Sequence, residues 1–418
     1  MRMKQKTKSI VTALLLGVLC AVTLSAVITV PDWETARADL LIGMQYETTG
    51  LDLDAVPGWL AALVMLHQNF PLDGWAWGPA AAGLAVLLCW VRGQREANPK
   101  RTELVLSIVF GIAEVLGLSI CKLGSWAFVF KNPYQLCVGV FCMAGYAVLF
   151  YHAVWGLYAL LGRSRTGGED FPQTRFAAWF AKAPGRASSL LIGAAWLPWV
   201  AVFWPGSVDW DSWGQISQVL GVQEMTAHHA IAQSYMPELS DGVKQYYKNP
   251  GKGDLARYML VWAKMLLKHP VCYFEATHAN SHGYYTITKC RAINDYYTFN
   301  NDICMEMSEM NVHYLDKSGY LRYAFVQALS AFEKLPLVGL TTSIGFMAWL
   351  TAVLGLWLAR CKAKPVLPIF IGLGIFWLTC IASPVNDCMR YFLPVAGCLP
   401  LVFCLAAVFS REKSEITV

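Results

Sequence analysis

Two carboxylates lie one residue apart in an aromatic-rich stretch, Trp204-Pro-Gly-Ser-Val-Asp209-Trp-Asp211-Ser-Trp213-Gly-Gln215. Carboxylates at this spacing can share a divalent cation, Mg²⁺ or Mn²⁺, or one of them can act as a base toward an acceptor hydroxyl. The alternative is structural, with Asp211 as the N-cap of an interfacial helix and Asp209 solvated. We take the two aspartates as candidate catalytic residues, and Trp213 and Gln215 as candidate substrate-binding residues beside them.

Arg390 is a candidate phosphate ligand at the end of a later apolar segment. It follows Asn386 and Asp387, and its planar guanidinium can donate two parallel hydrogen bonds to a phosphate at the level of lipid headgroups. The alternatives are an ion pair with Asp387 and plain anchoring at the membrane interface.

The histidines offer weaker signals. His228 and His229 can bind phosphate or a metal, but no metal-ligand spacing surrounds them and solvated side chains are the simpler interpretation. The pair His278 and His282 has the spacing of zinc ligands on a helix, yet the small polar residues around it disfavour a helix there. We therefore assign no metal site, and keep His228, His229 and His269 as candidate substrate-binding residues.

Glu114 interrupts an apolar run, in Gly111-Ile-Ala-Glu114-Val-Leu-Gly117. An ionisable group at that depth is costly and normally faces a bundle interior or a water-filled cavity. It can mark a proton or cation path, with His152 as the candidate partner. Alternatively, it is a hydrogen-bonded side chain that serves helix packing beside the two glycines.

Four short motifs together resemble the GT-C class of membrane glycosyltransferases and, more narrowly, an uncharacterised bacterial family of that class. They are Trp204-Pro205-Gly206 with the aspartate pair, His228-His229, Lys268-His269-Pro270, and Ser383-Pro384 with Arg390-Tyr391 and Pro394. The resemblance implies a polyprenyl-phosphate-linked sugar as donor, transfer at the outer membrane surface, Asp209 or Asp211 as the base, and Arg390 against the lipid phosphate. In that family further spans follow the histidine pair, so the resemblance also implies that this chain is internally shortened.

The composition indicates the fold class that positions these residues. Of the 418 residues, 56% are hydrophobic and 15% charged, whereas a soluble protein has about 25% charged residues. Crossing a membrane takes roughly 20 apolar residues, and eight segments qualify: 9–30, 73–91, 104–121, 136–161, 187–205, 336–359, 366–384 and 391–410. The segment Trp59–Leu66 is too short and is expected at the interface. We predict an all-α, polytopic helical membrane protein with about eight transmembrane helices and a mainly helical extracytoplasmic segment.

The basic residues predict the orientation. With the N-terminus in the cytoplasm, the short inner segments hold 18 lysines and arginines and the short outer segments hold 4, as the positive-inside rule requires. Both termini are then cytoplasmic, in a bacterial cytoplasmic membrane. The first span is expected to be an uncleaved signal-anchor, because its apolar stretch exceeds the roughly 7–15 residues of a signal peptide.

This topology places a polar segment, residues 206–335, outside the membrane, between a five-span region (1–205) and a three-span region (336–418). The segment holds 12 of the 18 tyrosines and 6 of the 8 histidines. Asp254 is expected to cap an amphipathic helix that ends at His269-Pro270 and lies either in the membrane interface or on the segment's own core. Further helices are predicted at about 290–310 and 318–334.

Together these patterns predict a membrane glycosyltransferase whose partners are the lipid-linked sugar and membrane lipid, with no nucleic acid. One alternative is a non-catalytic scaffold or degenerate family member, which the internal shortening favours. The other is a transporter or flippase-like protein, which Glu114 favours. The 13 cysteines are too dilute for a disulfide scaffold, and nine of them, Cys121 included, lie in or beside apolar runs and are expected to be free thiols.

Overall fold

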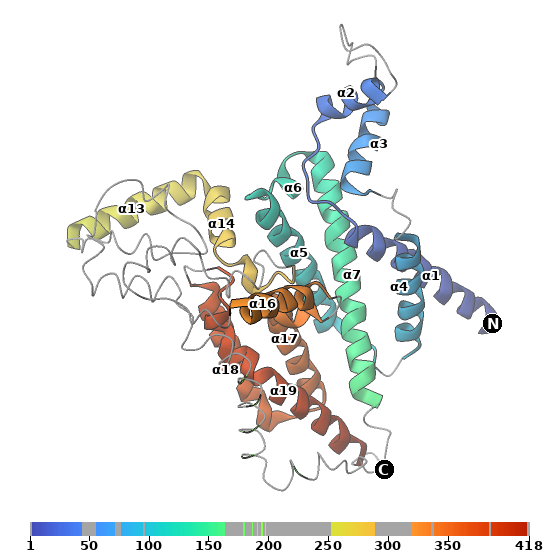
Figure 1. The fold of residues 1–418 in the computed structure, drawn as a ribbon, viewed down its shortest axis with the longest axis vertical. Helices are drawn as coiled ribbons and strands as arrows, with labels where there is room; N and C mark the ends of the chain where they lie inside the picture. Colours follow the sequence, from blue (N-terminus) through green and yellow to red (C-terminus); the bar gives the residue numbers. More distant parts are fainter. Residues whose placement is uncertain are drawn as a thin grey trace. The chain divides into compact units, whose positions relative to one another are not determined.

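The computed structural model describes residues 2–43, 56–71, 77–94, 97–163, 252–288, 319–335, 338–383 and 386–415, with five isolated positions between 179 and 197. Throughout these ranges every regular element is a helix (Figure 1). The predicted all-α class is therefore confirmed for this part of the chain.

Within the described ranges, four helical stretches are long and apolar enough to cross a membrane: 101–123, 133–162, 364–381 and 391–409. They belong to α5 (Arg101–Leu123), α7 (Pro133–Arg163), η7 with α18 (Lys364–Val366 and Leu367–Ile381) and α19 (Met389–Glu415). Shorter apolar stretches lie in α1 (Arg2–Leu24), α4 (Trp77–Gly93) and α17 (Ile344–Arg360). All seven coincide with predicted segments, and the remaining one, 187–205, lies outside the continuously described ranges.

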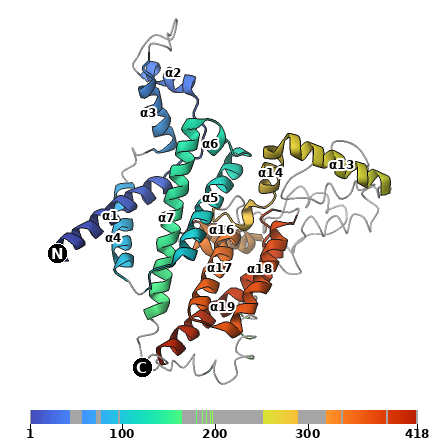
Figure 2. The same ribbon diagram turned by 180° about the vertical axis from the view of Figure 1, so that it is seen from behind.

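Small residues let the N-terminal helices pack closely. Gly17 of α1 lies against α4 at Ala81 and Ala85, and a methyl group on Gly17 would come within 2.8 Å of the Ala81 carbonyl. The helices α5 and α7 lie side by side (Figures 1 and 2), and Gly111 of α5 lies against the backbone of α7 at Met143. Close backbone approach at small residues is the usual basis of helix packing in membranes.

An aromatic core joins α7 to the C-terminal helices α17 and α19. The rings of Tyr158 in α7 and Trp357 in α17 lie 4.7 Å apart, and Val402 of α19 is buried in the same cluster. The Tyr158 hydroxyl donates to the carboxylate of Glu103, at 3.3 Å. Residues 1–166, 250–288 and 344–418 accordingly form one compact unit.

Residues 167–249 and 289–343 form a second unit. Its described helices are α16 (Gly319–Lys334) and η6 (Gly339–Thr342), which contact each other. The start and end of α16 confirm the helix predicted at 318–334, whereas the one predicted at 290–310 lies outside the described residues. The segment boundaries at 205 and 335 stay predictions.

The first unit also contains further helices that are not among the apolar ones. Near its N-terminus are α2 (Trp33–Gly43), α3 (Gly58–Asn69) and α6 (Ala127–Phe130); later come α13 (Lys252–Lys268), α14 (Pro270–Ala279) and the 3₁₀ turn η3 (His282–Tyr284). The short segment predicted at the interface, Trp59–Leu66, lies within α3. As predicted, α13 ends just before His269-Pro270. The predicted cap at Asp254 is wrong, because the helix already begins at Lys252 and Asp254 falls in its first turn.

Candidate functional site

Most of the predicted site residues lie outside the described ranges: Asp209, Asp211, Trp213, Gln215, His228 and His229. Two are placed. His269 is exposed between α13 and α14, and its backbone N–H donates to the Met265 carbonyl at 2.8 Å. Arg390 lies in the first turn of α19. The segments next to these two residues, 270–288 and 386–388, meet each other, and their contacts define the candidate site.

Residues 270–288, which we call the α14–η3 segment, lie among the ends of several apolar helices. The segment contacts α5, α17 and α18 (Figure 1). It brings five hydrogen-bonded polar side chains into one place, together with the turn that precedes α19. We call this group the polar cluster: Glu114, Trp126, His278, His282 and Asn386.

Glu114 anchors the end of the segment. Its carboxylate, 1% exposed in the middle of α5, accepts the backbone N–H of Ile287 at 2.6 Å. It also accepts the backbone N–H and the hydroxyl of Thr288, at 3.1 and 2.9 Å. Non-helical backbone at membrane depth is tolerated only where such partners satisfy it. The packing role considered for Glu114 is thus observed, although the partner is a remote backbone segment rather than His152, which bonds to Val148 of its own helix.

Thr286 packs the same stretch between two glycines. It is 2% exposed, and its side chain fills the space beside Gly117 of α5. The backbone of Thr286 lies against Gly345 at the start of α17. A methyl group on either glycine would overlap Thr286, so both glycines are needed for the segment to enter between the helices.

Asn386 ties the segment to the start of α19. Its side-chain oxygen accepts the backbone N–H of Gly283 at 2.9 Å, and its amide nitrogen lies 3.1 Å from Nδ1 of His282. A side chain on Gly283 would clash with Asp387, whose φ of 52° lies in the left-handed region that Asp adopts more readily than most residues. The turn that leads into Arg390 is therefore held in one conformation by the segment.

Two indoles satisfy the carbonyls of the 3₁₀ turn. Trp349 of α17 donates to the Tyr285 carbonyl at 2.6 Å, and Trp377 of α18 donates to the Tyr284 carbonyl at 2.9 Å. The Tyr284 ring is fully buried in a cluster with Ile344 and Phe392. The backbone polar groups of the turn thus find partners without water, as burial requires.

His278 belongs to the polar cluster as a neutral imidazole. Its Nδ1 accepts the Trp126 indole N–H at 2.7 Å, and its ring stacks on Tyr285 at a centroid distance of 5.4 Å. Burial, reinforced by nearby His282, lowers the pKa of His278 to about 4. Trp126 is held from its other side, because its backbone N–H donates to the Glu275 carboxylate at 2.9 Å.

Most side chains of the polar cluster hold the backbone of the α14–η3 segment or one another. Nδ1 of His282 lies 3.1 Å from both the Ala279 carbonyl oxygen and the Asn386 amide nitrogen, and its tautomer decides whether it donates to the first or accepts from the second. No three metal-binding side chains gather anywhere in the described ranges. As predicted, no continuous α-helix spans His278 and His282, since α14 ends at Ala279. What the cluster does is fix the α14–η3 segment and the first turn of α19, where Arg390 lies.

Sequence reasoning considered Glu114, His278, His282 and Asn386 separately but did not predict that they meet, and it missed Trp126 and the two indoles that bond to the turn. Trp126, Trp349 and Trp377 gave a usable signal, because indoles near the ends of apolar runs carry a donor that needs a partner when buried. Cys121 is a correction: it is disulfide-bonded rather than a free thiol. Its apolar sequence surroundings concealed its position near the end of α5.

The family model described as "Family of unknown function (DUF6020)" matches residues 205–417, slightly more than half of the chain, and the chain belongs to this family. No curated protein and no solved structure matches it.

Proposed function

We propose that this DUF6020 protein is a polytopic membrane glycosyltransferase that moves a sugar from a polyprenyl-phosphate donor to a cell-envelope acceptor at the outer membrane face. The observation that carries the proposal is the fixed turn before α19. Asn386 bonds to Gly283, and this contact holds the first turn of α19, with Arg390, beside the α14–η3 segment. The resemblance of the four motifs supplies the reaction class.

The proposed orientation has support from Cys121. This residue is disulfide-bonded close to the C-terminal end of α5, and disulfides persist in oxidising, extracytoplasmic compartments. The positive-inside distribution places the same end of α5 outside. Because α14 contacts α5, the polar cluster belongs on that side, with eight spans and both termini cytoplasmic.

In the proposed reaction, Asp209 or Asp211 takes the proton from the acceptor hydroxyl as its oxygen attacks the anomeric carbon of the sugar. The bond from that carbon to the phosphate oxygen breaks, and polyprenyl phosphate leaves with inversion at the sugar. Arg390 neutralises the charge of the leaving phosphate. The aspartate pair has the donor set that Mg²⁺ or Mn²⁺ prefers, and Trp213, Gln215, His228, His229 and His269 are the proposed substrate contacts.

The test is transfer by the purified full chain, in liposomes, from polyprenyl-phosphate sugars. Loss of a general base costs about 10²–10⁴-fold in rate, so Asp209→Asn or Asp211→Asn should lower turnover by at least about a hundredfold. Arg390→Gln should lower it as well, whereas Arg257→Gln, at an exposed arginine of α13, is the matched control. Full activity in both asparagine variants would rule out the proposed mechanism.

A non-catalytic scaffold is the second candidate. It is favoured by the polar cluster itself, whose side chains hold backbone groups and need no substrate to be satisfied. A wild-type chain that transfers no sugar from any donor, yet keeps its fold, would favour the scaffold. A transport path is no longer needed to explain Glu114, because its carboxylate is engaged by Ile287 and Thr288.

A further inference from the structure

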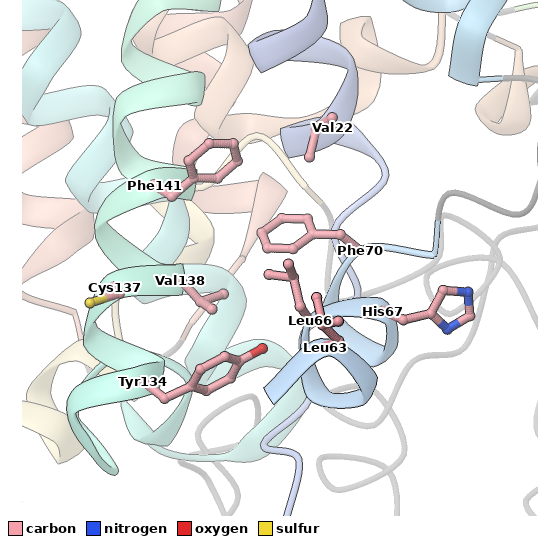
Figure 3. Close-up of a pocket in the computed structure, with 9 residues that line it drawn as sticks. All are labelled: Val22, Leu63, Leu66, His67, Phe70, Tyr134, Cys137, Val138 and Phe141. Atoms are coloured by element: carbon pink, nitrogen blue, oxygen red, sulfur yellow. The ribbon is translucent and has the colours of Figure 1, made fainter. Parts of the chain in front are cut away.

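An apolar cavity of about 520 Å³ opens between α1, α3 and α7, away from the polar cluster. Figure 3 shows Leu63 and Leu66 of α3, and Phe70 directly after it, facing Tyr134 and Phe141 of α7, with Val22 of α1 above them. The Phe70 and Phe141 rings meet edge to face, with centroids 5.4 Å apart. The cavity is several times larger than the engineered apolar cavities of about 150 Å³ that bind benzene and stay dry.

A second cavity, of about 370 Å³, adjoins the first at Tyr134, which lines both. Its lining includes two opposite charges, Asp32 and Lys131. Asp32 accepts hydrogen bonds from the backbone N–H and the hydroxyl of Thr35, at 2.9 and 3.0 Å. These bonds hold the pKa of Asp32 below its usual value, so it is ionised at neutral pH.

We propose that the two cavities together bind one zwitterionic phospholipid. One acyl chain fills the apolar cavity, the phosphate lies at Lys131, and the headgroup ammonium lies at Asp32. The joined cavities have the polarity of such a molecule, apolar along α7 from Tyr134 to Phe141, which is about 10 Å of helix, and charged beyond Tyr134.

Charge complementarity selects this occupant over other lipids. A purely anionic lipid would place its headgroup beside Asp32 without a compensating cation. A polyprenyl phosphate also lacks the ammonium. Water gains little in the apolar cavity, because the lining is almost wholly apolar and offers few hydrogen-bond partners. In the predicted topology both cavities lie at the outer face, with Trp33 and Trp59 at the depth where tryptophan anchors membrane proteins.

The test is native mass spectrometry of the purified full chain in detergent, with added phosphatidylethanolamine, phosphatidylglycerol or polyprenyl phosphate. The chain should retain phosphatidylethanolamine best. Lys131→Gln should weaken its binding about tenfold, the cost of one charge-assisted contact, while Lys122→Gln, at an exposed lysine on the same predicted face, should not.

A second pair of variants tests the acyl chain. Leu63→Trp fills the cavity from a position that is 52% exposed, and it should abolish retention of the lipid. Leu136→Trp, at a position on α7 that is 45% exposed and outside the lining, is the control. Equal retention in the two tryptophan variants, or tighter retention of polyprenyl phosphate than of phosphatidylethanolamine, would overturn the proposal. The variants do not touch the proposed catalytic residues, so sugar transfer can fail or succeed independently.

Discussion

Thr288 gives the carboxylate of Glu114 two hydrogen bonds, one from its backbone N–H and one from its hydroxyl, across 174 positions of sequence. Ile287 adds a third, at 2.6 Å. A carboxylate in the middle of an apolar helix is therefore the partner that lets a non-helical segment end between α5 and α17. Burying the Glu114 carboxylate costs free energy, and its hydrogen bonds to the N–H groups of Ile287 and Thr288 offset that cost.

Removing the Glu114 carboxylate should destabilise the protein strongly. Glu114→Ala leaves the N–H groups of half-buried Ile287 and exposed Thr288 without this acceptor, which costs about 1–3 kcal/mol in the free energy of unfolding. Glu114→Gln keeps an acceptor oxygen and should cost about 1 kcal/mol, as should Thr288→Val, which removes only the hydroxyl. Unfolding of the purified variants in detergent measures the order. Equal stability of Glu114→Ala and wild type would contradict the assigned role.

The two glycines against Thr286 predict a contrast between alanine substitutions. At Gly345 a new methyl group meets the Thr286 backbone, which cannot move away cheaply, so Gly345→Ala should lower stability by about 1–3 kcal/mol. Gly372 in α18 has open space around it. Gly372→Ala should therefore be neutral or stabilising by up to about 1 kcal/mol, the helix propensity gain of alanine. The same unfolding assay compares the two, and a reversed order would argue against the close packing.

The apolar helices could be predicted from the sequence because hydropathy and length are local properties. The end of α1 could not. The apolar run continues to residue 30, but the helix stops at Leu24, because the Asn69 carbonyl accepts the Val27 N–H at 2.8 Å and the Asn69 side chain donates to Thr29. Hydropathy records composition and contains no information about a hydrogen-bonding partner 42 positions away.

The candidate site, too, could be predicted from the sequence only where the signal is local. His269-Pro270 marks the end of α13 correctly, since proline disfavours helix in the residue before it. The partner of Glu114 could not be predicted, because a buried carboxylate shows in the sequence while the backbone amides that satisfy it look like any others. For Cys121, an apolar neighbourhood predicted a free thiol, and only the fold reveals the disulfide.

His278 predicts a loss of stability in mild acid. Its pKa is lowered to about 4 in the folded protein, whereas in the unfolded chain it is about 6.5. Between these two pH values the imidazole of His278 is protonated in the unfolded chain but neutral in the folded protein. The stabilisation is therefore complete above about pH 6.5 and is lost as the pH falls toward 4, by up to about 3 kcal/mol.

Unfolding midpoints between pH 7.5 and 4.5 check this. His278→Gln keeps an acceptor for the Trp126 indole but cannot titrate, so its stability should fall less than that of wild type over the same range. His269→Gln removes an exposed histidine and is the matched control. Parallel profiles of His278→Gln and wild type would assign the acid sensitivity to other groups.

The side of the membrane on which the polar cluster lies can be tested with thiol labelling. Cys272 of α14 is a free, exposed thiol, and the proposed orientation places it outside. In a chain whose other free cysteines, the exposed Cys137 and Cys404 included, are replaced by serine, a membrane-impermeant maleimide should label Cys272 in intact cells, and Cys272→Ser should remove that signal. Lys362, between α17 and η7, belongs on the cytoplasmic side, so Lys362→Cys in the Cys272→Ser chain should react only after permeabilisation. Labelling of position 362 in intact cells, with Cys272 protected, would invert the topology and place the α14–η3 segment in the cytoplasm, where a disulfide at Cys121 is not expected to persist.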